Sequence, residues 1–284
     1  MILPNSIAYG TTYTTDEEAY QFVSEALDAG YRIINTCAAY GNEKGMGRAI
    51  AGIPRDQLTI ISLDSNTKRS STNPERFDGY QAEMDQIYET LENLGLSYID
   101  CYMIHWPVPR YMENVWQQLN ADSWRAMEDC LEKGLIKHLG VSNFLSLHLK
   151  KLMETAKLPV EAVQLEIHPS FQQRKLVQQC KNQGMEVMAW SPLFKGRSLT
   201  LPAIMSLAKK YGRSAAQIIL RWNVQKGIVP IVSSSDSSRM KSNLDISSFE
   251  LEKEDINLID NLENGEHIEA FSYKRQRESA SKQR

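Results

Sequence analysis

Polar side chains follow short apolar runs at many points along the chain, and some of them can exchange protons. Asn35 and Tyr40 come after Ile33-Ile34, and His105 follows Tyr102-Met103-Ile104. A phenol and an imidazole are both capable of general acid–base chemistry. Similar endings recur later, at Ser142 with Asn143, Gln164 with Glu166, Trp190 with Ser191, and Ser233 with Ser234. If the apolar runs are parallel strands of one barrel, these side chains converge on a single face.

Each of these residues also has a purely structural explanation. Tyrosines are common at strand ends, and a buried histidine with satisfied hydrogen bonds is an ordinary core residue. Core packing alone does not require an imidazole directly after apolar strand residues, because the ring needs polar partners. Both interpretations of His105 therefore stay open until the elements that position it are identified.

The positioning elements follow from an alternation of amphipathic stretches and buried runs. Thr15 before three acidic residues predicts a helix start, and Gly30 predicts the end of that helix. We predict strands at 6–9, 31–35, 58–63, 98–105, 136–141, 162–166, 186–190 and 228–232. Helices are predicted after Thr15 and at 43–51, 74–94, 123–133, 145–156, 174–183, 201–211, 214–226, 236–243 and 253–262.

Eight strands separated by helices, without a linker or charge block between two halves, predict a single-domain α/β protein with a (β/α)8 TIM barrel. We expect the barrel to span residues 1–265. Residues 65–73 are polar and without apolar periodicity, and we expect them to form a loop on the active-site face. Residues 266–284 are predicted to be a C-terminal tail that either joins the substrate pocket or frays; their basic residues are Lys274, Arg275, Arg277, Lys282 and Arg284.

The composition is that of an ordinary globular protein. The 284 residues are 42% hydrophobic and 24% charged, with no apolar run long enough to span a bilayer and no secretory signal pattern. We therefore expect a cytoplasmic protein without a membrane partner. The net charge of −3 argues against general nucleic-acid binding. Cysteines 37, 101, 130 and 180 form no CxxC pair and no zinc-type spacing, so we expect reduced thiols and no metal site.

Six stretches of the sequence resemble motifs of the aldo-keto reductases, in the order in which that family has them. They are Gly30 to Glu43, Asp100 to Pro107, Gly140 to Phe144, Gln164 to Pro169, Ala189 to Leu193, and Arg239 to Leu244. The resemblance implies a (β/α)8 barrel, usually monomeric, that binds an extended nicotinamide dinucleotide and transfers hydride to aldehydes or ketones.

The resemblance also implies a cofactor site. Ser142, Asn143 and Gln164 match the residues that bind the nicotinamide amide, and Trp190 matches the aromatic platform, with Ser191 and Leu193 in the same motif. At the adenosine end, Ser233 stands where the family commonly has a lysine for the 2′-phosphate, while Ser234, Arg239 and Asn243 match and Ser242 replaces a glutamate. We expect NADP or NAD to bind. The resemblance favours NADP, and the loss of the lysine weakens that preference.

The catalytic group departs further from the family. A tyrosine donates a proton there, a lysine paired with an aspartate lowers the pKa of the tyrosine, and a histidine orients the carbonyl. Tyr40 and His105 match, whereas Asn35 and Leu63 occupy the aspartate and lysine positions. Losing both charges together avoids an unpaired buried charge, which costs about 3–5 kcal/mol.

The remaining pair must then work without the lysine. An isolated phenol has a pKa near 10, so a protonated His105 would have to supply the missing charge or act as the acid. Lys68, in the predicted loop, could also fold back into the site, although a solvated surface lysine is the simpler interpretation.

Three functions fit these substitutions. The first is hydride transfer to a carbonyl or imine-like small molecule with a modified proton relay through Tyr40 and His105. The second is a non-reductive reaction, such as an elimination, isomerisation or redox-neutral step; the third is an inactive dinucleotide-binding or regulatory protein. Substrate choice would depend on residues 107–121, 194–199 and 266–284. Trp106, Tyr111, Trp116, Phe271 and Tyr273 are expected either to line an apolar cleft or to serve packing.

Overall fold

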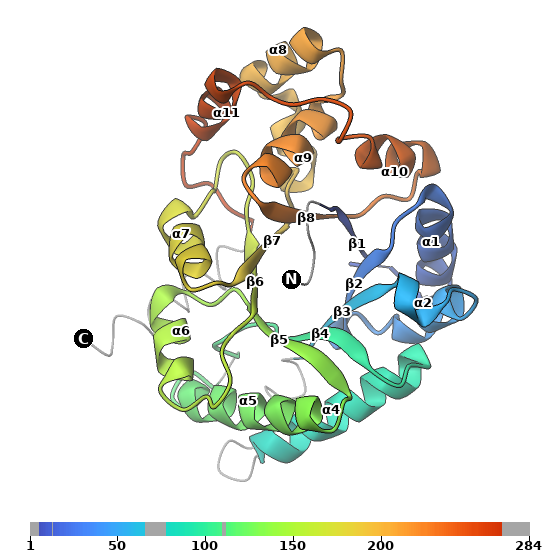
Figure 1. Ribbon diagram of the computed structural model, residues 1–284, viewed down its shortest axis with the longest axis vertical. Helices are drawn as coiled ribbons and strands as arrows, with labels where there is room; N and C mark the ends of the chain where they lie inside the picture. The colour runs from blue at the N-terminus through green and yellow to red at the C-terminus, as the bar shows by residue number, and fades with distance from the viewer. Residues whose placement is uncertain (1–5, 13, 66–77, 110–111, 269–284) are drawn as a thin grey trace.

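Eight parallel strands close into a barrel in chain order, with the first strand paired to the last (Figure 1). The computed structural model describes residues 6–12, 14–65, 78–109 and 112–268. The strands are β1 (Ala8–Gly10), β2 (Ile33–Cys37), β3 (Thr59–Leu63), β4 (Ile99–Ile104), β5 (Ile136–Ser142), β6 (Ala162–Glu166), β7 (Glu186–Trp190) and β8 (Ile228–Val232). The predicted (β/α)8 barrel is confirmed.

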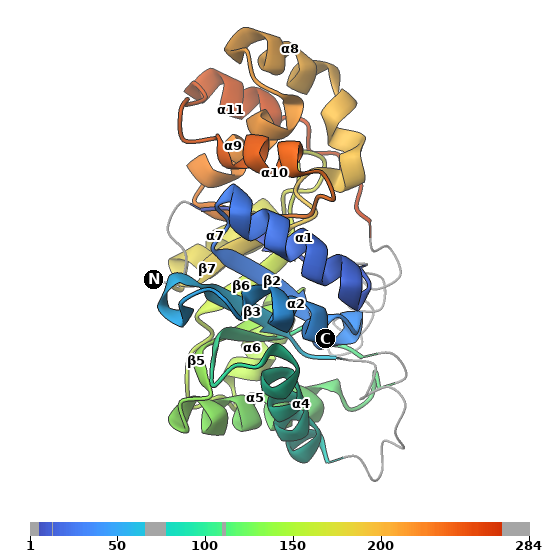
Figure 2. The same ribbon diagram turned by 90° about the vertical axis from the view of Figure 1, so that its right-hand side faces the viewer.

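Helices surround the barrel, and in Figure 2 α1 and α2 lie next to each other along its outside. The helices are α1 (Asp16–Ala29), α2 (Glu43–Ile50), α4 (Gly79–Leu94), α5 (Trp116–Glu132), α6 (Ser146–Met153), α7 (Arg174–Asn182), α8 (Pro202–Tyr211), α9 (Ala215–Gln225), α10 (Ser237–Leu244) and α11 (Lys253–Asp260). Short 3₁₀ turns cover Ala38–Tyr40, Arg55–Gln57 and Phe194–Thr200. No helix in the described part of the chain is long and apolar enough to cross a membrane.

The first helix shows how local sequence sets the element boundaries. The Thr15 hydroxyl accepts the N–H of Glu18, and the Glu18 carboxylate accepts the N–H of Thr15, so two free amides of α1 are satisfied. At the other end Gly30 has φ 113°, a left-handed conformation that other residues adopt at a cost. The chain therefore turns directly from α1 into β2.

Several predicted boundaries are wrong, and two of these differences affect the candidate site. Strand β2 covers Ile33–Cys37 instead of 31–35, because Thr36 and Cys37 are buried and pair with Ser62 and Leu63 of β3. Asn35 consequently lies within the strand. Helix α5 begins at Trp116 instead of residue 123, so the second half of the predicted loop 107–121 is helical.

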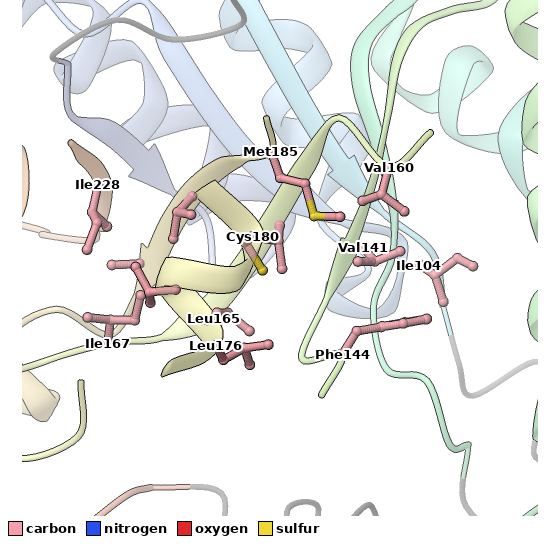
Figure 3. Packing of buried hydrophobic residues seen from close by; sticks show 14 of the residues in the cluster. Ile104, Val141, Phe144, Val160, Leu165, Ile167, Leu176, Cys180, Met185 and Ile228 are labelled. Atoms are coloured by element: carbon pink, nitrogen blue, oxygen red, sulfur yellow. The ribbon is translucent and has the colours of Figure 1, made fainter. Parts of the chain in front are cut away.

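Apolar side chains fill two layers. The outer layer packs the strands against the helices, and Figure 3 shows Leu176 and Cys180 of α7 next to Leu165 of β6. The inner layer fills the barrel itself and is here called the barrel interior. Its members are Ala8, Ile33, Cys37, Ile61, Leu63, Cys101, Met103, Ala162, Met188, Val229 and Ile231. Leu63 is therefore part of the packing that closes the barrel below the strand ends.

Candidate active site

The residues identified from the sequence lie at the carboxyl ends of the strands. Most belong to strand ends or to the residues just after them; Asn35 and Gln164 lie one or two positions inside, and Arg239 and Asn243 are on α10, which follows β8. Because all eight strands are parallel, these ends share one face of the barrel. The structure thus brings together candidates that are up to two hundred residues apart in the sequence.

Tyr40 and His105 are neighbours on this face. Their ring centroids are 6.4 Å apart, with an interplanar angle of 88°. The backbone of His105 is held on both sides: its N–H donates to Oδ1 of Asp64 at 2.8 Å, and its carbonyl accepts the Nδ2 group of Asn143 at 3.1 Å. These bonds fix the position of the imidazole relative to the phenol.

The imidazole of His105 is uncharged. Part of the residue reaches solvent, but its Nδ1 lies 3.2 Å from the Sγ atom of the fully buried Cys37. Burial lowers the pKa of His105 to about 4, against an opposing contribution from the Asp64 carbonyl. Burial also raises the pKa of the Cys37 thiol well above its usual value. The low pKa of His105 disfavours its protonated form as a source of charge at neutral pH.

The contact between Cys37 and His105 was not anticipated, although the sequence contained a signal for it. Residues 35 and 37 are two positions apart in a strand, so their side chains point to the same side of the sheet. Asp64 was also missed: it is buried directly after Leu63 and holds the backbone of His105.

Asn35 and Leu63, which stand at the family's aspartate and lysine positions, are both uncharged. Asn35 is buried, and its Oδ1 accepts the Nε2 group of Gln164 at 2.9 Å. Leu63 is only 1% exposed and packs in the barrel interior, against which Tyr40 also rests. Neither side chain introduces a charge beside Tyr40. Lys68 lies outside the described residues.

On the opposite side of the face, a chain of hydrogen bonds joins strands β5, β6 and β7. The indole N–H of Trp190 donates to Oδ1 of Asn143 at 2.9 Å, and Nδ2 of Asn143 is 3.1 Å from the Ser142 hydroxyl. That hydroxyl donates to the backbone carbonyl of Gln164 at 3.2 Å. The half-buried indole is thus fixed in orientation next to three amide and hydroxyl side chains.

Backbone strain gathers in the same region. In the described part of the chain, the non-glycine residues with positive φ are Asn143 (63°), Gln173 (49°), Ser191 (49°), Phe194 (52°) and Lys195 (51°). All five follow β5, β6 or β7. Such a conformation costs about 1–3 kcal/mol per residue and concentrates at functional sites. The half-buried Ser191 and Leu193 belong to this strained segment.

The predicted adenosine end lies between β8 and α10. The hydroxyl of Ser233 donates to the carbonyl of Gly10 at 2.7 Å, and Ser234 lies in the turn that leads to α10. The Arg239 side chain is 78% exposed, and its Nε lies 3.6 Å from Oδ2 of Asp236. Asn243 is buried, and its side chain hydrogen-bonds the hydroxyl of Tyr31.

These residues fit a nicotinamide dinucleotide. A half-exposed indole whose N–H is already bonded offers its ring face for stacking. Amide and hydroxyl groups flank it, and an exposed arginine stands at the other end of the site.

The aromatic residues predicted to line a cleft do not behave alike. Trp106 is half-buried, and its ring centroid lies 6.1 Å from that of His105. Trp116 serves packing, the second of the two expected roles: it is buried in α5 and packs edge-on against His148, with ring centroids 5.0 Å apart. Tyr111, Phe271 and Tyr273 lie outside the described residues, so only Trp106 is placed beside the candidate catalytic pair.

Glu166 holds the end of the described chain. Its side chain is fully buried at the end of β6, and its Oε1 accepts the backbone N–H of Ile268 at 2.6 Å. The same oxygen is 3.1 Å from Nε2 of His168, whose ring stacks on Phe194 at 4.0 Å. The segment before the tail is therefore attached to the rim of the barrel.

Comparison with known proteins agrees with this geometry. The model of the aldo/keto reductase family matches residues 5–264. A glyoxal reductase of Bacillus subtilis (strain 168) is 38% identical over 253 residues, which cover 88% of this chain and 86% of the relative. An aldo-keto reductase from a deep-sea metagenome library of the Medee basin has a TM-score of 0.85 at 34% identity, covering 94% of this chain and 93% of that one.

A third similar protein was solved with a ligand. The Bombyx mori aldo-keto reductase in complex with NADP has a TM-score of 0.80 at 28% identity, with 93% of this chain and 92% of that chain covered. The family match spans nearly the whole barrel, and the relatives share both sequence and fold over the same length. The chain belongs to the aldo/keto reductase family.

Proposed function

We propose that this chain is an NAD(P)H-dependent oxidoreductase that reduces an activated carbonyl or imine-like small molecule, using Tyr40 as proton donor and a neutral His105 to orient the substrate. The observation that supports this most directly is the placement of the Tyr40 and His105 rings side by side on the strand-end face. The same face holds the bonded pair of Trp190 and Asn143.

The cofactor supplies a hydride when it is bound. In this proposal Ser142, Asn143 and Gln164 bind the nicotinamide amide, and Trp190 provides the surface on which the ring stacks. Their mutual hydrogen bonds fix these groups before binding, so less conformational freedom is lost when the complex forms.

Proton donation to the substrate is the step for which this site offers the least assistance. The Tyr40 hydroxyl is proposed to donate to the substrate oxygen, while the Nε2 atom of His105 hydrogen-bonds that same oxygen. His105 is neutral in this proposal, and Leu63 stands where the family has a lysine. Neither residue therefore brings a positive charge that would stabilise the phenolate of Tyr40. The acid is therefore weak, and the substrate must need little acid assistance.

Two substrate classes meet that requirement. A carbonyl next to a second carbonyl is already electron-poor, and an iminium carries its own positive charge. The similarity to a protein named glyoxal reductase supports the first class, since glyoxal is a 1,2-dicarbonyl. We therefore propose small dicarbonyl compounds as the first substrates to test.

The proposed location, oligomeric state and partners are those usual in the family. We propose a cytoplasmic monomer that acts on a small molecule rather than on nucleic acid or membrane. The four buried cysteines, none in a disulfide, support a reducing compartment.

A redox-neutral reaction or a binding role without turnover is the second candidate. It is favoured by the bond between Asn35 and Gln164, which uses part of the amide that would otherwise serve the nicotinamide. Either role would keep dinucleotide binding and lose reduction.

The test separates these functions in two steps. Dinucleotide binding is measured by fluorescence titration, and oxidation of the reduced cofactor is then followed by absorbance with aldehydes, ketones, 1,2-dicarbonyls and cyclic imines. We expect binding, with turnover fastest for dicarbonyls or iminium compounds. Binding without oxidation across the panel would overturn the reductase proposal in favour of the second candidate, and failure to bind would remove both.

A further inference from the structure

Asp236 occupies the amino end of helix α10, at the adenosine part of the proposed site. Its Oδ1 accepts the backbone N–H groups of Ser238 at 2.9 Å and Arg239 at 3.1 Å. Its Oδ2 lies 3.6 Å from Nε of the Arg239 side chain. The carboxylate therefore already uses two free amides of the helix and faces its arginine.

The turn before the helix holds this carboxylate in place. The N–H of Asp236 is 3.1 Å from the Ser234 hydroxyl, which is also 3.2 Å from the Asp236 carbonyl. The Asp236 side chain is nevertheless 47% exposed, so an incoming ligand can reach it. Asp236 thus combines a fixed backbone with an accessible negative charge.

A 2′-phosphate would need the groups that Asp236 has taken. Helix amides and arginine are the usual partners of phosphate, and here both already interact with a carboxylate. Between 231 and 241 the sequence has two basic residues, Arg239 and Lys241, and Ser233 stands where the family commonly has a lysine. A phosphate would therefore approach the Asp236 carboxylate, which already faces Arg239, and like charges repel.

A free ribose hydroxyl makes the opposite demand. It is neutral and can donate a hydrogen bond to a carboxylate oxygen, which is how an acidic residue selects NAD in other dinucleotide sites. Oδ2 of Asp236 retains capacity to accept such a bond, because its contact with Arg239 at 3.6 Å is an ion pair and not a close hydrogen bond.

We propose that Asp236 makes this site select NAD(H) over NADP(H), by repelling the 2′-phosphate and accepting the 2′-hydroxyl. The inference rests on the proposed function, because it presupposes that a dinucleotide binds. It reverses the slight preference for NADP that the family resemblance suggests.

The experiment compares NADH and NADPH on the intact chain by fluorescence titration at fixed ionic strength. We expect NADH to bind at least about tenfold more tightly. Asp236→Asn removes the charge and keeps a good helix cap, so NADPH affinity should rise about tenfold or more, while NADH affinity falls only a few-fold. Ser233→Lys combined with Asp236→Asn should make NADPH the tighter ligand.

Asp78→Asn is the matched control. Asp78 caps α4 by accepting the N–H of Gln81 at 3.0 Å, so the same substitution there changes a helix cap outside the proposed adenosine site. It should leave the ratio of NADH to NADPH affinity unchanged. Calorimetry with 5′-AMP and 2′,5′-ADP repeats the comparison without the nicotinamide ring.

The outcomes are distinguishable. Equal affinities in the unmodified protein, or tighter NADPH binding there, would overturn the role of Asp236 whether or not the variants fold. An NADH preference that Asp236→Asn leaves unchanged would do the same. If neither dinucleotide nor either adenosine fragment binds, the proposed function itself fails.

Discussion

Two arcs of the strand-end face differ in their charge and in their hydrogen bonding. The cofactor arc consists of Ser142, Asn143, Gln164 and Trp190, and the acid arc consists of Asn35, Tyr40, Leu63 and His105. The cofactor arc has polar groups that bind one another, and one of its residues, Asn143, has positive φ. The acid arc has no non-glycine residue with positive φ, and its replaced positions are neutral. The polar groups of the cofactor arc are therefore bonded to one another, whereas Asn35 and Leu63 bring no charge to the acid arc.

The strongest way to break this comparison is Tyr40→Phe. If Tyr40 is the acid, reduction should fall by a factor of about 10²–10⁴, because the proton donor is removed. Dinucleotide affinity should stay the same, since the cofactor arc is untouched. Steady-state rates and fluorescence titration check both. Tyr88→Phe, at an exposed position of α4, is the matched control. Unchanged turnover in Tyr40→Phe would remove Tyr40 from the mechanism.

Restoring the lost charges tests the acid arc directly. Leu63→Lys alone places an unpaired ammonium in the barrel interior and should lower the free energy of unfolding by about 3–5 kcal/mol. Adding Asn35→Asp should recover part of that stability and raise the rate of carbonyl reduction above that of either single variant. Urea unfolding and turnover of all three variants provide the measurement. Additive effects of the two substitutions would show that the sites are not coupled.

Removing the platform tests the cofactor arc. Trp190→Ala should weaken dinucleotide binding by about 1–3 kcal/mol, the range measured for stacking on an aromatic side chain. Trp190→Phe keeps a ring but loses the bond to Asn143, so its dinucleotide affinity should lie between those of the unmodified protein and Trp190→Ala. Titration with the preferred dinucleotide measures the effect. An unaltered affinity in Trp190→Ala would contradict the stacking role.

The smallest effect concerns a histidine behind the cofactor arc. His148 is buried against Phe144, and burial lowers its pKa to about 4. The unfolded imidazole takes up a proton near pH 6.5, but the folded one does so only near pH 4. The stability from the neutral ring is therefore complete above pH 6.5 and is lost as pH falls towards 4, by about 1.4 kcal/mol per pH unit.

His148→Asn should flatten that dependence. The asparagine oxygen can replace Nδ1 of His148 as acceptor of the Leu145 N–H, and it does not titrate. Urea unfolding between pH 4.5 and about 7 should show a slope smaller by up to about 1.4 kcal/mol per pH unit. An unchanged slope in His148→Asn would show that His148 is not a source of acid sensitivity.

The sequence was sufficient for the barrel because most buried runs are marked by a preceding glycine: one with positive φ lies before β2, β4, β5, β7 and β8. Its failures are physical. The segment from 116 to 122 is rich in glutamine and asparagine, and its helical state depends on burying Trp116 against His148 of α6, a contact between residues far apart in the chain. The cofactor arc was identified from motifs, but its hydrogen bonds join three strands and have no local signature.

The acid arc shows the same limit at shorter range. The sequence identified the loss of two charges, yet it could not decide the protonation of His105. That depends on the burial that closing the barrel imposes, against the opposing hydrogen bond to the Asp64 backbone, 41 residues away in the chain. Asp236 was overlooked because a capping acid is common at helix starts, and only its distance to Arg239 indicates competition with a phosphate.

The bond from Glu166 to Ile268 has a consequence for where the folded unit ends. A chain shortened to residue 265 would keep every strand and helix described above but would remove a backbone donor to a fully buried carboxylate. Oε1 of Glu166 would then keep only its contact with Nε2 of His168 at 3.1 Å. We expect a truncation after residue 268 to melt measurably higher than one after residue 265, because the shorter chain loses a hydrogen bond worth about 0.5–1.5 kcal/mol. In that case residues 266–268 stabilise the barrel.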